Sequence, residues 1–502
     1  MKKVIFTFFI LYIPFTHCQV IDVETKLYDM FVFSGSSFLS GKEDLRYHPA
    51  RNAFPPIYSV NLKMNYHDIY REWTPGNGNS KTNYQYDMGI ETEFPLKIFK
   101  RNFGLNLNLK KQIHSSTYST KYNEAEFSGK NWEIYSVRGS INWEDTTHRA
   151  GISIKYTAGN NNAGLKINRY PSVGTDEFMN KYFYGLLEPA FGKDIEFSFN
   201  TNEINYAIEY TRILSRNFNL GVNFYSETNQ YDLGINYYGN VEKIEGWKNL
   251  NGFLKFNRYS FGITCEYRIK KFIFRSLTSY SVPDYKLNIN QDNLLSKDNV
   301  NLEISNLSMG DCSGRGIASG AGISYTFNGN ISADLSYTLI RNNYSGYLKA
   351  STPVLGFEIL PIAHQFLDDF DLKMNNNLFS LDINHDVNGI VNYLISFSYL
   401  TSLNKVNYHY NLITEFGFGS NKENQNTVFT IDLYKISLDA EIKVSNGLAV
   451  NFLFDQYIPV IKGSGSTGKI SGQSSPPSSS DKSNVNNWGG SIYGFSVVYN
   501  FN

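Results

Sequence analysis

The sequence has little charge, few cysteines and almost no long apolar runs. Only 18% of its 502 residues are charged, against about 25% in ordinary soluble domains, and 46 basic residues balance 46 acidic ones. This balance argues against a nucleic-acid-binding protein, which usually carries a basic excess. A helical membrane protein needs apolar runs of about 18 or more residues, and the only candidate lies at the extreme N-terminus. Disorder is excluded because 16% of the residues are aromatic.

The N-terminus is typical of a secretory signal peptide. Lys2 and Lys3 precede an almost wholly apolar stretch at 4–15, and smallish residues follow it. A signal anchor and lipidation of Cys18 are the less favoured alternatives. We therefore expect residues 1–18 to be removed on export.

Two cysteines remain after cleavage, Cys265 and Cys312. Two cysteines in so long an exported chain do not form a disulfide scaffold. Because Cys265 lies in a strand pattern and Cys312 in an expected loop, two free thiols are predicted, although a single bridge between them stays open.

Apolar and polar residues alternate along most of the chain, which is the signature of half-buried β-strands. The pattern occurs at 58–66, 84–91, 103–110, 135–143, 150–156, 204–210, 218–224, 231–237, 259–267, 317–327, 331–339, 379–383, 391–399, 436–444, 448–454 and 493–501, with weaker copies near 250–256 and 272–280. These segments predict about 18 strands, with 16–18 favoured and 14 possible.

Short and long connections largely alternate between these segments. Asn328-Gly329, Asn388-Gly389 and Asn446-Gly447 favour tight hairpin turns with φ above zero. The expected long connections are 74–81, 119–130, 159–202, 282–316, 342–375, 402–427 and 456–490. Short periplasmic turns and long external loops are typical of outer-membrane barrels.

The apolar face of the strands is rich in Tyr and Phe, whereas the core of a large soluble β-sandwich array, the alternative fold, should be rich in compact aliphatic residues. Tyr and Phe form aromatic girdles in membrane barrels. The segment 493–501 resembles the C-terminal strand of outer-membrane barrels, which usually ends in an aromatic residue, although here Phe501 is penultimate. The predicted fold is therefore all-β, a single antiparallel transmembrane β-barrel over residues 57–502.

The polar face of the alternating strands should line a wet lumen, and its charges would tune solute selectivity. The simpler role of these charges is to solvate the inner wall. The candidate lumen charges are Lys63, Asp87, Glu91, Glu93, Lys110, Arg138, Lys155, Glu209 and Asp334.

Two expected loops, 159–202 and 342–375, contain more apolar residues than water-exposed loops usually carry. They either pack on one another as a cap or form an apolar mouth for a hydrophobic solute. The candidate mouth residues are Phe178, Tyr182, Phe183, Leu186, Phe357, Ile359 and Phe366.

No motif in the chain predicts a catalytic, cofactor or metal site. Residues 463–469 match the core of a phosphate-binding loop, but Ile470 replaces the hydroxyl residue that would hold Mg²⁺. The eight histidines are scattered and have no metal-ligand spacing. We therefore expect no cofactor, no metal and no enzymatic activity, although a Ser–His pair across strands stays open.

The N-terminal segment 19–56 carries a family resemblance. Ser34-Gly35-Ser36-Ser37 followed by Tyr47-His48-Pro49-Ala50 resembles the Gly/Ala-rich stretch and Asn-Pro-Ala turn that precede the barrel in FadL-like outer-membrane transport proteins, with His48 where Asn is usual. The resemblance implies a barrel, usually of 14 strands, that is closed by its N-terminal segment and takes up hydrophobic compounds passively. It implies that residues 19–56 form a plug or hatch.

The sequence thus predicts an integral protein of the outer membrane of a Gram-negative bacterium. The expected function is passive passage of small or hydrophobic solutes through a porin-like channel. The alternative is a structural or assembly barrel of a secretion or adhesion complex with a plugged lumen. The expected partners are outer-membrane lipid, the barrel-insertion machinery during assembly and the solute, with no nucleic acid.

Overall fold

The described chain consists almost entirely of β-strands. The computed structural model describes residue 39 and residues 48–51, 58–73, 79–98, 101–119, 124–128, 132–167, 194–241, 244–297, 300–353, 362–414, 420–465 and 487–501. Within these ranges, no helix is long and apolar enough to cross a bilayer. The short helix η1 (Pro49–Arg51) precedes the first strand.

Seventeen strands lie in these ranges. They are β1 (Ser59–Trp73), β2 (Asn79–Ile98), β3 (Arg101–Ser119), β4 (Glu124–Ser128), β5 (Trp132–Glu144), β6 (His148–Ile167), β7 (Asp194–Ser215), β8 (Phe218–Val241), β9 (Ile244–Ile269), β10 (Phe272–Lys297), β11 (Val300–Asn328), β12 (Ile331–Pro353), β13 (Ile362–Val387), β14 (Val391–Thr414), β15 (Ser420–Lys443), β16 (Leu448–Gly465) and β17 (Asn487–Asn500).

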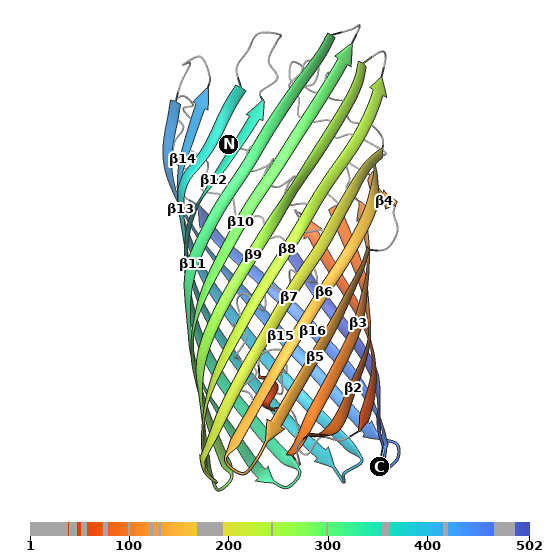
Figure 1. The fold of residues 1–502 in the computed structure, drawn as a ribbon, viewed down its shortest axis with the longest axis vertical. Helices are drawn as coiled ribbons and strands as arrows, with labels where there is room; N and C mark the ends of the chain where they lie inside the picture. The colour runs from red at the N-terminus through yellow and green to blue at the C-terminus, as the bar shows by residue number, and fades with distance from the viewer. Residues whose placement is uncertain are drawn as a thin grey trace.

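The strands close into a single barrel (Figure 1). Each pairs antiparallel with its sequence neighbours, and the first strand also pairs with the last, so that Ser59 lies opposite both Glu93 and Asn500. Closure leaves no sheet edge with unpaired backbone groups, which is the condition for a β-structure to span lipid. The strands tilt strongly around the barrel, and β17 ends at the same end of it as the short turns.

The described strands fill sixteen positions around the barrel. The short strand β4 and the longer β5 both pair with β3 on one side and β6 on the other, so they are two parts of one interrupted strand. The prediction of about 18 strands was too high, and the 14 strands usual in FadL-like barrels are too few. The count was too high because 218–224 and 231–237 are one strand, β8, and 250–256 and 259–267 are another, β9.

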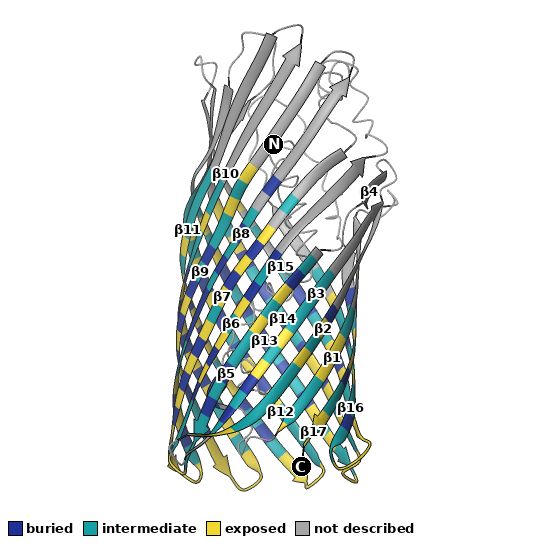
Figure 2. Ribbon diagram, turned by 45° about the vertical axis from the view of Figure 1, so that its right-hand side comes forward, coloured by how far each residue is buried: buried dark blue, intermediate teal, exposed yellow. Residues whose placement is uncertain are grey.

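Apolar side chains cover the outer face of the barrel, and small or polar ones line the inner face. In β7, for example, Ile204, Tyr206 and Ile208 are exposed, whereas Glu203 and Glu209 are buried. Figure 2 shows this alternation as exposed and buried residues that follow one another along each strand. The exposed apolar set, which we call the apolar belt, includes Leu62, Met64, Ile90, Leu109, Val137, Ile154, Ile204, Tyr206, Ile208, Phe261, Ile263, Tyr280, Ile317, Tyr337, Ile395, Phe452 and Tyr499.

The strands extend much further toward the long connections than predicted. Only residues 298–299 separate β10 from β11, where 282–316 was expected to be a connection. Residues 354–361 separate β12 from β13, where 342–375 was expected. The predicted connections were too long because alternation marks contact with an apolar phase on one face. Backbone pairing nevertheless continues beyond the segments in which this alternation was recognised.

The connections predicted to be short, at 145–147, 216–217, 270–271, 329–330, 388–390 and 444–447, lie at one end of the barrel (Figure 1). At the other end the connections 242–243 and 298–299 are equally short, so short and long connections do not strictly alternate as predicted. Asn388 and Gly389 have φ of 54° and 69°, which is the backbone predicted for an Asn-Gly hairpin turn. The prediction was wrong for the other two Asn-Gly pairs, neither of which has positive φ. In one of them, Oδ1 of Asn328 instead accepts hydrogen bonds from the backbone N–H groups of Asn330 and Ile331, at 2.9 Å and 2.8 Å.

The two cysteines are free thiols, as predicted. Cys265 lies on β9 and Cys312 on β11, separated by β10, and they belong to opposite faces of the wall. A bridge between them is therefore incompatible with the fold.

Candidate functional site

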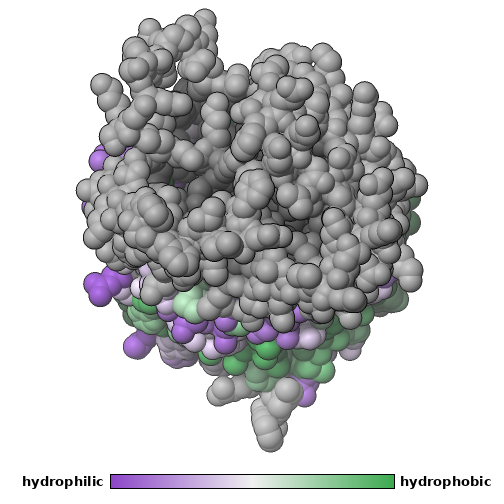
Figure 3. Space-filling view, turned by 90° about the horizontal axis from the view of Figure 1, so that it is seen from above, coloured by the Kyte–Doolittle hydropathy of each residue, from purple (hydrophilic) through white to green (hydrophobic). Residues whose placement is uncertain are grey.

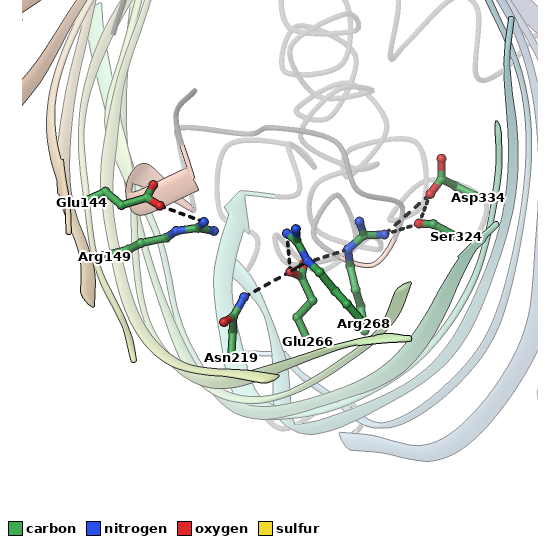
Figure 4. Close-up of polar contacts among 8 residues, drawn as sticks. Glu144, Arg149, Asn219, Glu266, Arg268, Ser324 and Asp334 are labelled. Atoms are coloured by element: carbon green, nitrogen blue, oxygen red, sulfur yellow. Dashed lines mark hydrogen bonds and ion pairs between the residues drawn. The ribbon is translucent and has the colours of Figure 1, made fainter. Parts of the chain in front are cut away.

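Charged and polar side chains point from several strands into the barrel interior (Figure 4). On one side, Arg149 donates to Glu144 at 2.9 Å. On the other, the carboxylate of Glu266 accepts hydrogen bonds from Asn219 at 3.2 Å and from Arg268 at 2.9 Å. The inner wall therefore carries a network of charges whose members neutralise one another.

Five of the predicted lumen charges lie together on β1, β2, β3 and β5. The Glu91 carboxylate lies between two cations, with Lys63 Nζ 2.7 Å from Oε2 and Arg138 Nη2 3.0 Å from Oε1. Beside them, Lys110 Nζ lies 2.7 Å from Oδ2 of Asp87. Because alternate residues of a strand point to the same side, the sequence placed these residues on one face of the sheet. The register between neighbouring strands then brings them within ion-pair distance.

Three more candidates lie on the same inner face. Lys155 Nζ is 3.2 Å from Oε1 of Glu203, and Nη1 of Arg275 is 3.6 Å from Oδ1 of Asp334. Glu93 follows Glu91 at the same parity on β2. The structure thus places these candidates on the inner wall, and their effect on selectivity stays a prediction.

Several buried charges escaped sequence reasoning. Arg258 Nη2 lies 2.6 Å from Oε2 of Glu227, and both side chains are more than nine-tenths buried. Lys435 Nζ lies 2.9 Å from Oδ2 of Asp455. Residues 227 and 258 lie just outside the segments in which alternation was recognised. Each is an even number of residues from the polar positions of the nearest such segment, so it lies on the same inward face. In the described ranges, no group of three or more His, Cys, Asp or Glu side chains is placed to hold a metal ion.

The ninth candidate, Glu209 on β7, contacts the N-terminal segment. Nδ1 of His48 lies 3.2 Å from Oε1 of Glu209, and the backbone N–H of Ala50 donates to Oε2 at 3.1 Å. His48 is fully buried and Glu209 is 1% exposed. Residues His48, Pro49 and Ala50, which belong to the motif that carries the family resemblance, therefore lie inside the barrel against its wall, and η1 lies in the interior in Figure 1.

Glycines in the wall allow this close approach. A Cβ at Gly151 on β6 would clash with the backbone of Pro49 and Ala50. On the other side of the barrel, Leu39 is fully buried, and a Cβ at Gly322 on β11 would clash with its backbone. The two described parts of the N-terminal segment thus contact the inner wall at two places where the wall has no side chain.

One part of the inner wall is apolar, and we call it the apolar sector. Met374, Leu378, Leu400 and Leu433 form a buried cluster on β13, β14 and β15. Leu400 is 2% exposed and follows Ser396 and Ser398 on the inward face of β14. Partly buried residues pack against this cluster, namely Tyr344, Leu372, Ile431 and Tyr457.

Aromatic contacts extend the apolar sector across β9 to β12. The rings of Phe256 and Tyr285 lie 4.5 Å apart, and those of Tyr285 and Tyr344 lie 6.0 Å apart edge to face. Gly314 on β11 makes room for Tyr344, because a Cβ there would lie 2.5 Å from Cδ1 of the ring. The guanidinium of Arg258 lies 5.8 Å from the Phe256 centroid, so the sector borders the charge network.

Sequence reasoning missed the apolar sector and placed apolar residues in loops instead. Of the candidate mouth residues, Phe366 lies within β13 opposite Lys349 and Asn411, so it belongs to a strand and not a loop. The others, Phe178, Tyr182, Phe183, Leu186, Phe357 and Ile359, lie outside the described residues. The available signal was a run of apolar residues at inward parity just beyond the recognised strands, such as Met374, Leu378 and Leu400.

Comparison with known proteins finds similarity in solved structures only. No family model matches the chain, and no curated protein matches it. The toluene transporter TodX of Pseudomonas putida is 8% identical, with 91% of this chain and 93% of that chain covered and a TM-score of 0.41. The toluene transporter TbuX of Ralstonia pickettii is 10% identical, with 94% and 98% covered and a TM-score of 0.37.

A FadL homologue of Pseudomonas aeruginosa is likewise 10% identical, with 94% of this chain and 97% of that chain covered and a TM-score of 0.41. Two of these three structures are described as toluene transporters. The family that the N-terminal segment resembles is thus represented among them. Because identity is so low, no residue role is carried over from these structures.

Proposed function

We propose that this protein is an integral outer-membrane channel for the passive passage of small hydrophobic solutes. The apolar sector of the inner wall is the observation that carries the proposal. A closed barrel with an apolar outer belt has the surface that lipid requires, and an aqueous pore for ions would need no cluster such as Met374, Leu378, Leu400 and Leu433 on its inner face.

The apolar sector supplies a weak binding surface for such a solute. Burial of apolar surface contributes about 25 cal/mol per Å², so a side chain that covers roughly 40 Å² of a small aromatic solute contributes about 1 kcal/mol. Several such contacts hold the solute without trapping it, which passive passage requires. The neutralised charge pairs beside the sector would discourage the passage of ions.

The N-terminal segment, residues 19–56, acts in this proposal as a plug. The contacts of His48 and Ala50 with Glu209, and of Leu39 with β11, support this role because they attach the segment to the wall at two separate strand groups. A solute would pass when one of these attachments opens.

The proposal is tested by the entry of N-phenylnaphthylamine, an apolar fluorescent probe, into intact Gram-negative cells that express the protein. The test position is Leu372, a partly buried residue of the apolar sector that keeps some free surface. Leu372→Asn keeps the approximate side-chain size but replaces apolar surface with an amide. We expect entry to slow by roughly fivefold, because about 1 kcal/mol of binding is lost. Leu372→Met keeps the apolar surface and should behave as the native protein.

Equal rates in cells with the native protein, Leu372→Asn and no protein would contradict the proposal. That result, together with planar bilayers that show no conductance, would favour the structural or assembly barrel. Rapid ion conductance with no effect of either substitution would instead indicate an aqueous pore.

A further inference from the structure

Four basic side chains stand together on the outer surface of the barrel, beside the apolar belt. They are Arg315 on β11, Arg341 on β12, Lys373 on β13 and Lys405 on β14, and all four are exposed. Their parity is that of the exposed residues Ile317, Tyr337, Ile383 and Ile395, so they point outward and not into the lumen. We call them the outer cation cluster.

The strand register places these cations close to one another. Lys373 lies directly opposite Lys405, and both Arg315 and Lys373 lie opposite Asn343. Neighbouring strands are about 4.8 Å apart, so the cluster from β11 to β14 spans roughly 15 Å. Like charges directly opposite one another, as Lys373 and Lys405 are, destabilise a sheet, and a bound anion would relieve this repulsion.

Protein carboxylates do not supply that partner. Among the described residues, none of the four cations forms an ion pair or a side-chain hydrogen bond. Asp371, an exposed carboxylate two residues before Lys373 on the same face, lies opposite Ser345 and Asn407 and forms no ion pair with any of these four described cations. The next carboxylate, Asp311, lies opposite Lys286 on β10.

Another outward lysine shows the contrasting arrangement. Lys111 Nζ lies 2.9 Å from Oε1 of Glu133 and 5.3 Å from the centroid of the Tyr135 ring. That cation is neutralised within the protein. The outer cation cluster therefore differs from a cation that is neutralised within the protein.

The cluster lies where the apolar belt ends on the side of the long connections. Ile317 is 54% exposed, and Arg315 follows it on the same face toward those connections. Tyr337 donates to Oδ1 of Asn377 at 2.7 Å at the same boundary. Figure 3, seen from the long-connection end, shows hydrophobic residues on the outer side with hydrophilic ones beside the end. In a membrane this is the level of the external headgroups.

We propose that the outer cation cluster binds the phosphates of an outer-leaflet glycolipid that carries more than one phosphate. Arg binds phosphate through two parallel N–H donors, and Lys binds it as a point charge. Four cations over roughly 15 Å fit a headgroup with several phosphates better than a single anion. The inference rests on the membrane location in the proposed function, and it is independent of the solute.

Titration of the protein in phosphatidylcholine nanodiscs with fluorescent diphosphoryl lipid A tests the inference. The variant with Arg315→Gln, Arg341→Gln, Lys373→Gln and Lys405→Gln should bind roughly 600-fold more weakly, because each of the four surface cations contributes roughly fivefold. Lys111→Gln is the matched control and should bind as the native protein. Added phosphatidylcholine with the same acyl chains as the lipid A should not displace the fluorescent lipid A from the native protein.

Equal binding by the native protein and the quadruple variant would overturn the inference. Binding of inorganic pyrophosphate as tightly as lipid A would also overturn it, since the site would then recognise a soluble anion. If the quadruple variant does not fold, the single substitution Lys405→Gln tests the inference instead. In the absence of anionic lipid, Lys405→Gln should raise the temperature of unfolding, because it relieves the repulsion from Lys373. The same variant should still bind lipid A more weakly than the native protein.

Flotation with phosphatidylcholine vesicles, and the heat-dependent mobility shift in SDS, report membrane insertion separately. If the protein floats with vesicles and shows the mobility shift but does not bind lipid A, only the lipid site is refuted. If it shows neither flotation nor the mobility shift, the membrane location itself is refuted.

Discussion

Glu209→Ala should release the N-terminal segment from the barrel wall. In the native protein the Glu209 carboxylate is almost fully buried and faces His48 Nδ1 at 3.2 Å and the Ala50 N–H at 3.1 Å. Alanine removes both acceptor oxygens and leaves the rest of β7 unchanged, because the side chain points into the lumen.

The size of the effect follows from these two contacts. A hydrogen bond to a charged group contributes about 1.5–3 kcal/mol, so the lower bound for two is about 3 kcal/mol. A loss of about 3 kcal/mol shifts the equilibrium between attached and released segment by roughly 150-fold. Glu209→Gln keeps an oxygen for the Ala50 N–H and should have a smaller effect.

The assay is single-channel recording in planar bilayers. We expect Glu209→Ala to spend a much larger fraction of time in a high-conductance state than the native protein. Glu203→Ala is the matched control, because Glu203 lies on the same face of β7 but its carboxylate contacts Lys155 and Asn205. Identical open fractions for Glu209→Ala, Glu203→Ala and the native protein would refute the reasoning.

Gly151→Ala places a Cβ against the backbone of residues 49–50 and should raise conductance without removing any charge, whereas Gly139→Ala should not, because its nearest contact is at 3.6 Å. In the turn after β5, hydrogen bonds from the backbone and hydroxyl of Thr147 hold the pKa of Asp145 below its usual value. The Asp145 carboxylate therefore stabilises the folded protein fully above the unfolded-state pKa of about 4, and this stabilisation is lost as pH falls through the lower folded-state pKa. Asp145→Asn should lower the melting temperature at pH 7 and have less effect at the acid limit. Mass spectrometry of the denatured, unreduced protein after maleimide labelling should count two labels, and a single bridge between the thiols would contradict the fold.

Sequence periodicity was sufficient for the architecture where the chain contacts an apolar phase. In β7 and β14, alternation of apolar and polar residues distinguished the outer face from the inner face because lipid contacts one side only. Inward parity likewise identified Lys63, Glu91 and Arg138 as residues of one wall. Backbone pairing extends beyond the segments in which this alternation was recognised, and the expected connections such as 282–316 were therefore too long.

Only the tertiary structure decided which inward residues meet. The pairing of Glu91 with both Lys63 and Arg138 depends on the register between strands, which sequence does not specify. The apolar sector brings together β9 to β16, whose inward apolar residues are separated by long stretches of chain, and the attachment of His48 to Glu209 joins residues far apart in sequence. Alternation is a local property of each strand and is readable from the sequence, whereas contacts across the lumen depend on closure and register of the whole barrel.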